Sequence, residues 1–210
     1  MKRDDRITIL DARRDAYEQA AAQLNADVLA GRITVDVWFE RTAEELKGLH
    51  ITAYMAGRDL TWNEMTFADW GRIGAVLRKE YGHLNTKRSI LTVNPDRWTL
   101  AQLDASSKQY AASAMRSFSR GEAAHRGLDP SVLPAHPADG STPCRGFDKC
   151  RWAITTISKV RGDYVVSWRL GRAEHCRVCV ARSRHKSRGG WGGLRIRGGV
   201  LIDTPTPING

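Results

Sequence analysis

The chain has 210 residues, of which 41% are hydrophobic and 27% charged, and its formal net charge is +10. This composition is typical of a globular protein with a buried core. No apolar run approaches the ~20 residues that a membrane-spanning helix needs, and the charged N-terminus is not a secretory signal. We therefore expect no membrane partner and a cytoplasmic setting, where clustered cysteines are more often metal ligands than disulfides.

Residues 1–128 are predicted to form a helical region. Apolar residues recur there at helical spacing, and Thr66–Asp69 and Thr99–Gln102 each have the pattern of a capping box, which opens a helix. Thr34 is a further candidate N-cap. The four expected helices cover residues 8–30, 34–57, 66–84 and 99–125. We expect them to pack as a bundle that makes protein contacts.

Residues 129–143 contain four prolines and are predicted to be a semi-extended connector. The balance of basic and acidic residues changes at the end of this connector. Residues 1–143 hold 19 Lys and Arg against 19 Asp and Glu, whereas residues 144–210 hold 14 against 4. The whole basic excess therefore belongs to the C-terminal third, which indicates a negatively charged partner, nucleic acid first, or else a solubilising face.

Residues 144–202 are predicted to form a basic β-module. Residues 152–157 and 164–168 are strand-like runs on either side of a turn at Gly162, which is typical of a β-hairpin. We expect a short strand between residues 194 and 202. Residues 203–210 are expected to be a flexible tail.

All four cysteines lie in this module, and the candidate metal ligands are Cys144, Cys150, Cys176 and Cys179. Cys176-x2-Cys179 has the spacing of a zinc knuckle, in which a tight turn aims both sulfurs at one point. The first pair is more widely spaced than usual, so Asp148 or His175 is an alternative ligand. Reduced structural cysteines, disulfides and redox chemistry are the competing interpretations. Four closed ligands predict a structural zinc, and the expected fold class is α+β: a helical N-terminal region followed by a small zinc-stapled β-hairpin module.

Arginines surround the cysteines. The candidate nucleic-acid contacts are Arg145, Arg151, Arg177, Arg182 and Arg184. Together with Trp152, Trp168 and Trp191 they would form a basic surface with stacking rings. The alternative for the tryptophans is that they fill the core of the β-module.

The cysteine-bearing segments LPAHPADGSTPCRGFDKCRWAI (133–154) and YVVSWRLGRAEHCRVCVARS (164–183) resemble the C-terminal half of tailed-phage minor head proteins. These are head morphogenesis proteins similar to the F protein of phage Mu. Residues 65–84 and 110–128 are similar to the helical region of the family. Cys144 and Cys150 match the outer two of three family cysteines, and Asp148 stands where the middle one is expected.

The resemblance implies a virion or procapsid component, present in the host cytoplasm during assembly. It would bind portal and capsid proteins near the portal and help head assembly or DNA delivery. It implies no reaction and no small-molecule substrate, and the sequence shows no GxSxG, HExxH or GxxxxGK[ST] motif. The competing hypotheses are a regulatory zinc-ribbon protein that binds nucleic acid and, third, an enzyme remnant or small toxin.

Overall fold

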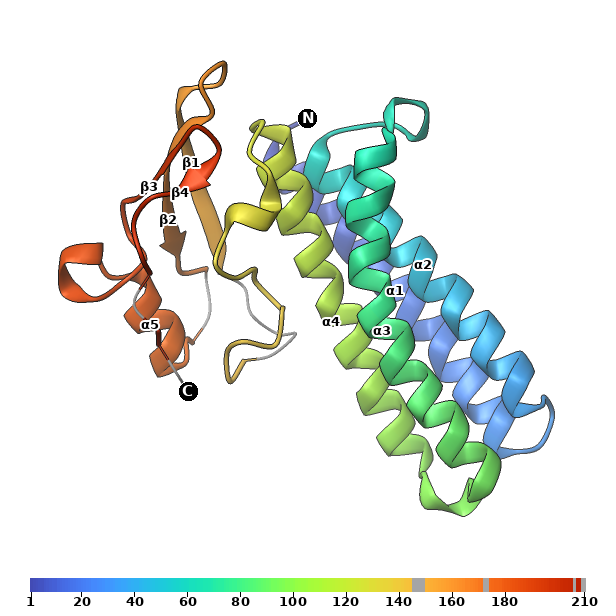
Figure 1. Cartoon of the computed structure of the whole chain (residues 1–210). Helices are drawn as coiled ribbons and strands as arrows, with labels where there is room; N and C mark the ends of the chain where they lie inside the picture. The colour runs from blue at the N-terminus through green and yellow to red at the C-terminus, as the bar shows by residue number, and fades with distance from the viewer. Residues whose placement is uncertain (145–149, 172–173, 206, 209–210) are drawn as a thin grey trace.

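The computed structural model describes residues 1–144, 150–171, 174–205 and 207–208. It confirms the α+β class, since four long helices precede a four-stranded antiparallel sheet. Figure 1 shows the helices side by side in one elongated bundle, with the sheet beside the C-terminal half of α4. There are two hydrophobic clusters. One lies within the bundle, and the other joins the sheet to the C-terminal end of α4 and the segment that follows it.

The helices are α1 (Arg3–Leu29), α2 (Val35–Arg58), α3 (Phe67–Val93) and α4 (Leu100–His125). All three predicted caps are present, with Thr34 accepting a backbone hydrogen bond and Thr66 and Thr99 forming capping boxes. Helix α3 is longer than predicted, because nothing breaks it before Asn94-Pro95 and Leu91 packs into the core. No helix in the described ranges is both long and apolar enough to cross a membrane.

Helix α2 is the central helix of the bundle and packs against α1, α3 and α4. Its contact with α4 depends on two glycines. A Cβ at Gly57 would lie 2.1 Å from the Phe118 carbonyl oxygen, and one at Gly121 would lie 2.4 Å from that of Tyr54. Both distances are far inside van der Waals contact with backbone, so only glycine permits this approach of the two helices.

The predicted hairpin is confirmed as β1 (Arg151–Ser158) and β2 (Asp163–Arg169), paired antiparallel. The prediction of a single strand between residues 194 and 202 is wrong in one respect. The segment forms two short strands, β3 (Leu194–Arg197) and β4 (Val200–Leu201), which follow β2 in the sheet order β1-β2-β3-β4. The reason is Gly198-Gly199, both with positive φ, which turn the chain back on itself.

The segment predicted as a connector is folded against the β-module. Leu133 and Ala135 are buried in the same cluster as the sheet, and the Trp152 indole N–H donates to the Ala135 carbonyl over 2.8 Å. The N–H is thereby satisfied inside the core, as a buried indole requires. Residues 129–143 therefore contribute to the packing of the β-module rather than acting as a loose spacer.

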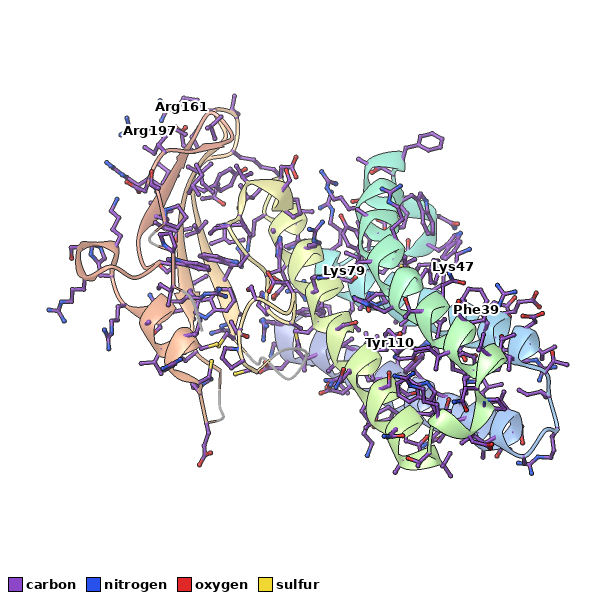
Figure 2. The ribbon with its side chains drawn as sticks, turned by 60° about the horizontal axis from the view of Figure 1, so that its bottom comes forward. Phe39, Lys47, Lys79, Tyr110, Arg161 and Arg197 are labelled. Carbon is purple, nitrogen blue, oxygen red and sulfur yellow. The ribbon has the colours of Figure 1, made fainter. Side chains whose placement is uncertain are left out.

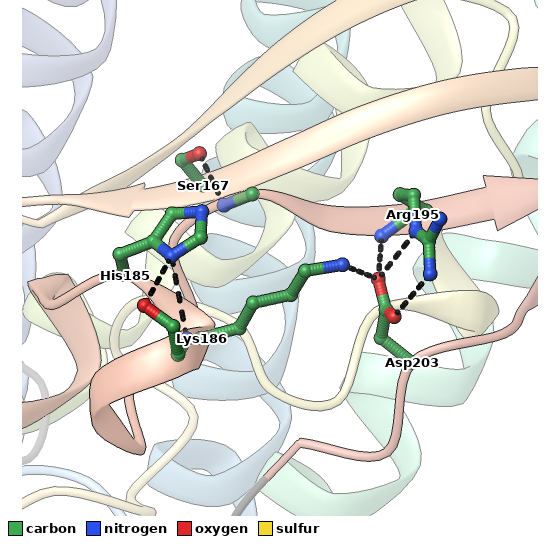
Figure 3. Close-up of polar contacts among 7 residues, drawn as sticks. Ser167, His185, Lys186, Arg195 and Asp203 are labelled. Carbon is green, nitrogen blue, oxygen red and sulfur yellow. Dashed lines mark hydrogen bonds and ion pairs between the residues drawn. The ribbon is translucent and has the colours of Figure 1, made fainter.

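The tail is also held at its start, contrary to the flexible tail expected from residue 203. Asp203 accepts from the Lys186 ammonium at 2.6 Å and from the Arg195 backbone N–H at 2.6 Å, with a further bond from the Arg195 guanidinium at 3.2 Å (Figure 3). The Arg195 and Lys186 contacts hold the pKa of the Asp203 carboxyl well below its usual range. These bonds fix the chain beside β3, and Ile208 packs against the module cluster.

Candidate metal centre

The second cysteine pair is placed by a helix start. Cys176 is the N-cap of α5 (Arg177–Ser183), and its sulfur accepts the Cys179 backbone N–H over 3.5 Å. This turn brings the Cys176 and Cys179 side chains together, as the x2 spacing predicts. The Cys179 N–H points toward the Cys176 sulfur and favours negative charge on it.

The hairpin brings the first pair to the second. Because Arg151 of β1 is opposite Arg169 of β2, the chain segments before β1 and after β2 leave the sheet at the same end. The sulfurs of Cys144, Cys176 and Cys179 all lie within 4.8 Å of one another. A tetrahedral zinc with Zn–S bonds of about 2.3 Å needs sulfurs separated by about 3.8 Å, so this grouping fits a metal ion after a small contraction.

Cys150 is not part of this three-sulfur group, and its sulfur lies near a histidine instead. Its sulfur is 3.7 Å from Nδ1 of His175, whose Nε2 is 2.9 Å from the Gly171 carbonyl oxygen. Cys150 is 1% exposed and belongs to the same hydrophobic cluster as the other three cysteines. The alternative ligand Asp148 and the predicted contact Arg145 lie outside the described residues.

The thiols differ in their readiness to lose a proton. Burial raises the pKa of Cys144 to about 11. Burial also disfavours the Cys176 thiolate, yet bonds from the Cys179 N–H, the Cys144 thiol and the Val178 N–H lower the pKa of Cys176 below its usual value. The Cys144 thiol, which keeps its proton, is therefore a hydrogen-bond donor to the Cys176 sulfur. A bound cation would replace that proton and charge both thiolates. None of the four cysteines forms a disulfide.

The module tryptophans are core residues, which confirms the second interpretation of them. Trp152, Trp168 and Trp191 are at most 7% exposed. Trp152 and Trp191 stack with parallel planes at 6.0 Å, and Trp168 meets both edge to face. The rings therefore cannot stack on nucleic-acid bases, and a surface built on them is excluded.

Arg182 lies inside this tryptophan cluster, so the prediction that it contacts nucleic acid is wrong. It is 4% exposed, and its guanidinium lies 4.1 Å from the centre of the Trp191 ring. It also donates to the Ser141 hydroxyl and carbonyl, at 3.0 and 3.1 Å. Helical spacing is the cause, because position 182 shares the inner face of α5 with Val178 and Cys179.

The remaining predicted contacts, Arg151, Arg177 and Arg184, are exposed. The sheet adds three arginines that the cysteine-centred prediction missed. Arg169, Arg195 and Arg197 are exposed, and alternation along β2 and β3 sets them opposite the buried face. Period-two alternation with Trp168, Leu194 and Ile196 was the signal in the sequence. We call the exposed set Arg151, Arg169, Arg195 and Arg197 the arginine face.

Comparison with known proteins identified no relative of the chain. No protein-family model, curated protein or solved structure matches the chain. The three-sulfur group and the arginine face are therefore the features on which a functional proposal rests, beside the resemblance in the cysteine-bearing segments.

Proposed function

We propose that this protein is a non-enzymatic structural component of a tailed-phage head, a minor head protein that acts in head morphogenesis near the portal. The observation that carries the proposal is the convergence of Cys144 with Cys176 and Cys179. These residues belong to the two segments that resemble the minor head family. A site closed by four protein ligands has no open position for a substrate, so its role is to hold the module together.

We infer that the metal is zinc and that Cys150 is the fourth ligand. Soft thiolates select zinc among the common divalent ions of the cytoplasm, and four of them form a closed tetrahedral site. Cys150 supplies the fourth thiolate from the same buried cluster. His175 then acts as a neighbour of the site, oriented by the Gly171 carbonyl.

The helical bundle supplies the surface for protein partners in this proposal. At the end where α2 turns into α3, Trp62 is 59% exposed and Phe67 is 97% exposed. Large apolar side chains in such positions are typical of protein interfaces. Portal and capsid proteins are the partners that the head assignment implies.

The test of this function is the composition of the particle. We expect peptides of this chain in purified virions and in procapsids, by mass spectrometry after separation from unassembled protein. The phage-encoded portal protein is the positive control, and an early non-structural protein is the negative control. Absence of the chain from both kinds of particle would contradict the head assignment and favour the regulatory nucleic-acid-binding alternative.

The arginine face supports a contact between the module and DNA. Arg151 lies directly opposite Arg169 in the sheet. Like charges in this position destabilise a sheet, and an anionic partner would remove the penalty. Within the described residues, Arg151, Arg169 and Arg197 form no ion pair with an acidic side chain.

Figure 2 shows Arg197 beside Arg161 at the tip of the module, where the Gly199 N–H donates to the Gly162 carbonyl. Because the tryptophans are buried, the proposed contact is with phosphates of duplex DNA rather than with bases.

Replacing Arg151 and Arg169 together by glutamine is expected to weaken binding of the full chain to duplex DNA. Each lost phosphate contact lowers the slope of log K against log salt by about one, so the double variant should lose about two. Fluorescence anisotropy over a salt series measures that slope. Lys47→Gln, at an exposed position on α2, is the matched control and should leave the slope unchanged. An unaltered slope in the arginine variant would contradict DNA contact through this face.

A further inference from the structure

A cleft of about 750 Å³ lies between α3 and α4 in the helical bundle. Helix α3 packs mainly against α2 and meets α4 at few points, so the two helices leave space between them. Lys79 of α3 and Tyr110 of α4, both labelled in Figure 2, line the cleft from opposite sides. The volume is within the range of small-molecule sites in proteins, and the cleft is separate from the metal centre.

Lys87 places a cation in this cleft without a carboxylate partner among the described residues. Its ammonium donates to the Ser106 hydroxyl and, over 2.9 Å, to the Tyr110 hydroxyl, and it lies 4.1 Å from the centre of the Tyr110 ring. These partners are neutral oxygens and a ring face. Burial lowers the pKa of Lys87 to about 8, although the nearby Glu80 charge opposes the shift. A bound anion would stabilise the charged ammonium.

Arg116 adds a second cation, 7% exposed, at the cleft wall. Its guanidinium donates to Glu80 at 3.0 Å and to the Val76 carbonyl at 3.4 Å. Its Nε–H is buried and has no acceptor in the part of the chain that the structure describes. Arg116 therefore adds positive charge to the cleft wall, balanced in part by Glu80.

The acidic side chains of the cleft are already engaged. Glu80 binds Arg116, and Asp139 accepts the backbone N–H groups of His136 and Ser141, both at 2.8 Å. The Asp139 bonds hold a tight loop in which Ala138 has φ of 62°, a strained value for a residue with a side chain. Ala138 and Gly140 of this loop form the end of the cleft. The positive charge therefore exceeds the negative charge that is free to balance it.

We propose that the α3–α4 cleft binds a small molecule that carries a phosphate or carboxylate group on an apolar body. Lys87 and Arg116 bind the anionic group through charge-assisted hydrogen bonds. Trp98 and Ile90, at the other end of the cleft, contact the apolar body. The site goes beyond the proposed head function. It is a binding site without a reaction, so its ligand is not a substrate.

The test is calorimetric titration of the full chain with three probes: inorganic phosphate, pyrophosphate and benzoate. Wild type should bind at least one probe at concentrations up to about 10 mM, and Lys87→Met should bind it about tenfold more weakly. Lys87→Met should remain folded, because it removes a half-buried cation that has no carboxylate partner in the described structure. Comparison of the probes distinguishes a phosphate-bearing ligand from a carboxylate.

Two further variants keep the result specific to the cleft. Ala105→Trp fills the cleft from an exposed position on α4 while leaving both cations in place, and it should also abolish binding. Lys47→Met removes an exposed lysine on α2 and should bind as wild type does. If no probe binds wild type, or if Lys87→Met and Ala105→Trp bind as tightly as wild type, the proposal is wrong. The second outcome would place the anion on the basic β-module.

Discussion

Cys176→Ser is expected to abolish tight zinc binding and to unfold residues 144–202 while the helical bundle stays folded. A structural zinc site contributes about 10–16 kcal/mol in zinc-finger peptides, and that free energy is folding free energy. The module core consists mainly of three tryptophans around Arg182 and a small sheet, and it cannot replace such a contribution. The bundle has its own hydrophobic cluster and should survive.

Three measurements on the full chain check this result. Elemental analysis should show no bound zinc, near-ultraviolet circular dichroism should lose the signal of the packed tryptophans, and limited proteolysis should leave a fragment that ends near residue 128. The far-ultraviolet helical signal should persist. A variant that keeps its near-ultraviolet spectrum and its protease resistance would contradict a structural metal.

The fourth ligand is tested by a matched pair of variants. Cys150→Ser should release zinc as Cys176→Ser does, whereas His175→Gln should keep about one zinc per chain and lower its affinity by roughly 10–100-fold, as outer-shell changes do. The two side chains are 3.7 Å apart, so both variants disturb the same neighbourhood. Zinc loss in His175→Gln with zinc retained in Cys150→Ser would reverse the assignment.

Lowering the pH from 7 to 5 is expected to destabilise the bundle through His50. This side chain is fully buried, and burial, aided by the charge of Arg116, lowers its pKa to about 3. The unfolded chain titrates near 6.5, so the stabilisation is complete above that pH and is lost progressively below it. At pH 5 the loss is about 2 kcal/mol of unfolding free energy, at about 1.4 kcal/mol for each pH unit.

The hydrogen bonds around His50 explain why it stays neutral. Ser113 donates its hydroxyl to the Tyr110 carbonyl at 2.8 Å, so its oxygen accepts from Nε2 of His50. Nδ1 then accepts from the Ser117 hydroxyl at 2.8 Å. An added proton on Nδ1 would require the Ser117 hydroxyl to turn its own proton away and accept instead. His136 behaves alike, since burial and Arg120 lower its pKa to about 4.

Urea unfolding at pH 7, 6 and 5, followed by far-ultraviolet circular dichroism, measures the effect. Carboxylates with a lowered pKa, such as Asp69, reduce the unfolding free energy only at lower pH. The change between pH 7 and 5 therefore reports mainly on the histidines. His50→Gln should show a clearly smaller fall in unfolding free energy between pH 7 and 5 than wild type. Equal falls in the two proteins would show that His50 does not carry the pH dependence.

Local chemistry explains which parts of the fold were predictable. The caps at Thr34, Thr66 and Thr99 depend on residues three positions apart, and all three were predicted. The hairpin follows from β-branched and aromatic runs around Gly162, and its closure predicts the approach of Cys144 to Cys176 and Cys179. Each of these inferences needs only neighbouring residues or a single turn.

The errors came from contacts between distant segments. The sequence alone predicts that Arg182 is a surface cation. In the structure its guanidinium packs on Trp168 and Trp191 and donates to Ser141, in the segment predicted as a connector. From the sequence, Asp203 belongs to a frayed tail. In the structure it is held by Lys186, in the turn before β3, and by Arg195 of β3. The cleft between α3 and α4 had no sequence signal, because it depends on how far two helices diverge.

The metal content of the wild-type chain, purified under reducing conditions without added metal, decides whether the cysteines hold a structural zinc. We expect about one zinc per chain by elemental analysis, and four cysteines that become reactive toward an alkylating reagent only after chelation. Chelation should remove the near-ultraviolet signal of the module at the same time. A metal-free chain with a folded β-module and four freely reactive thiols would contradict a structural zinc.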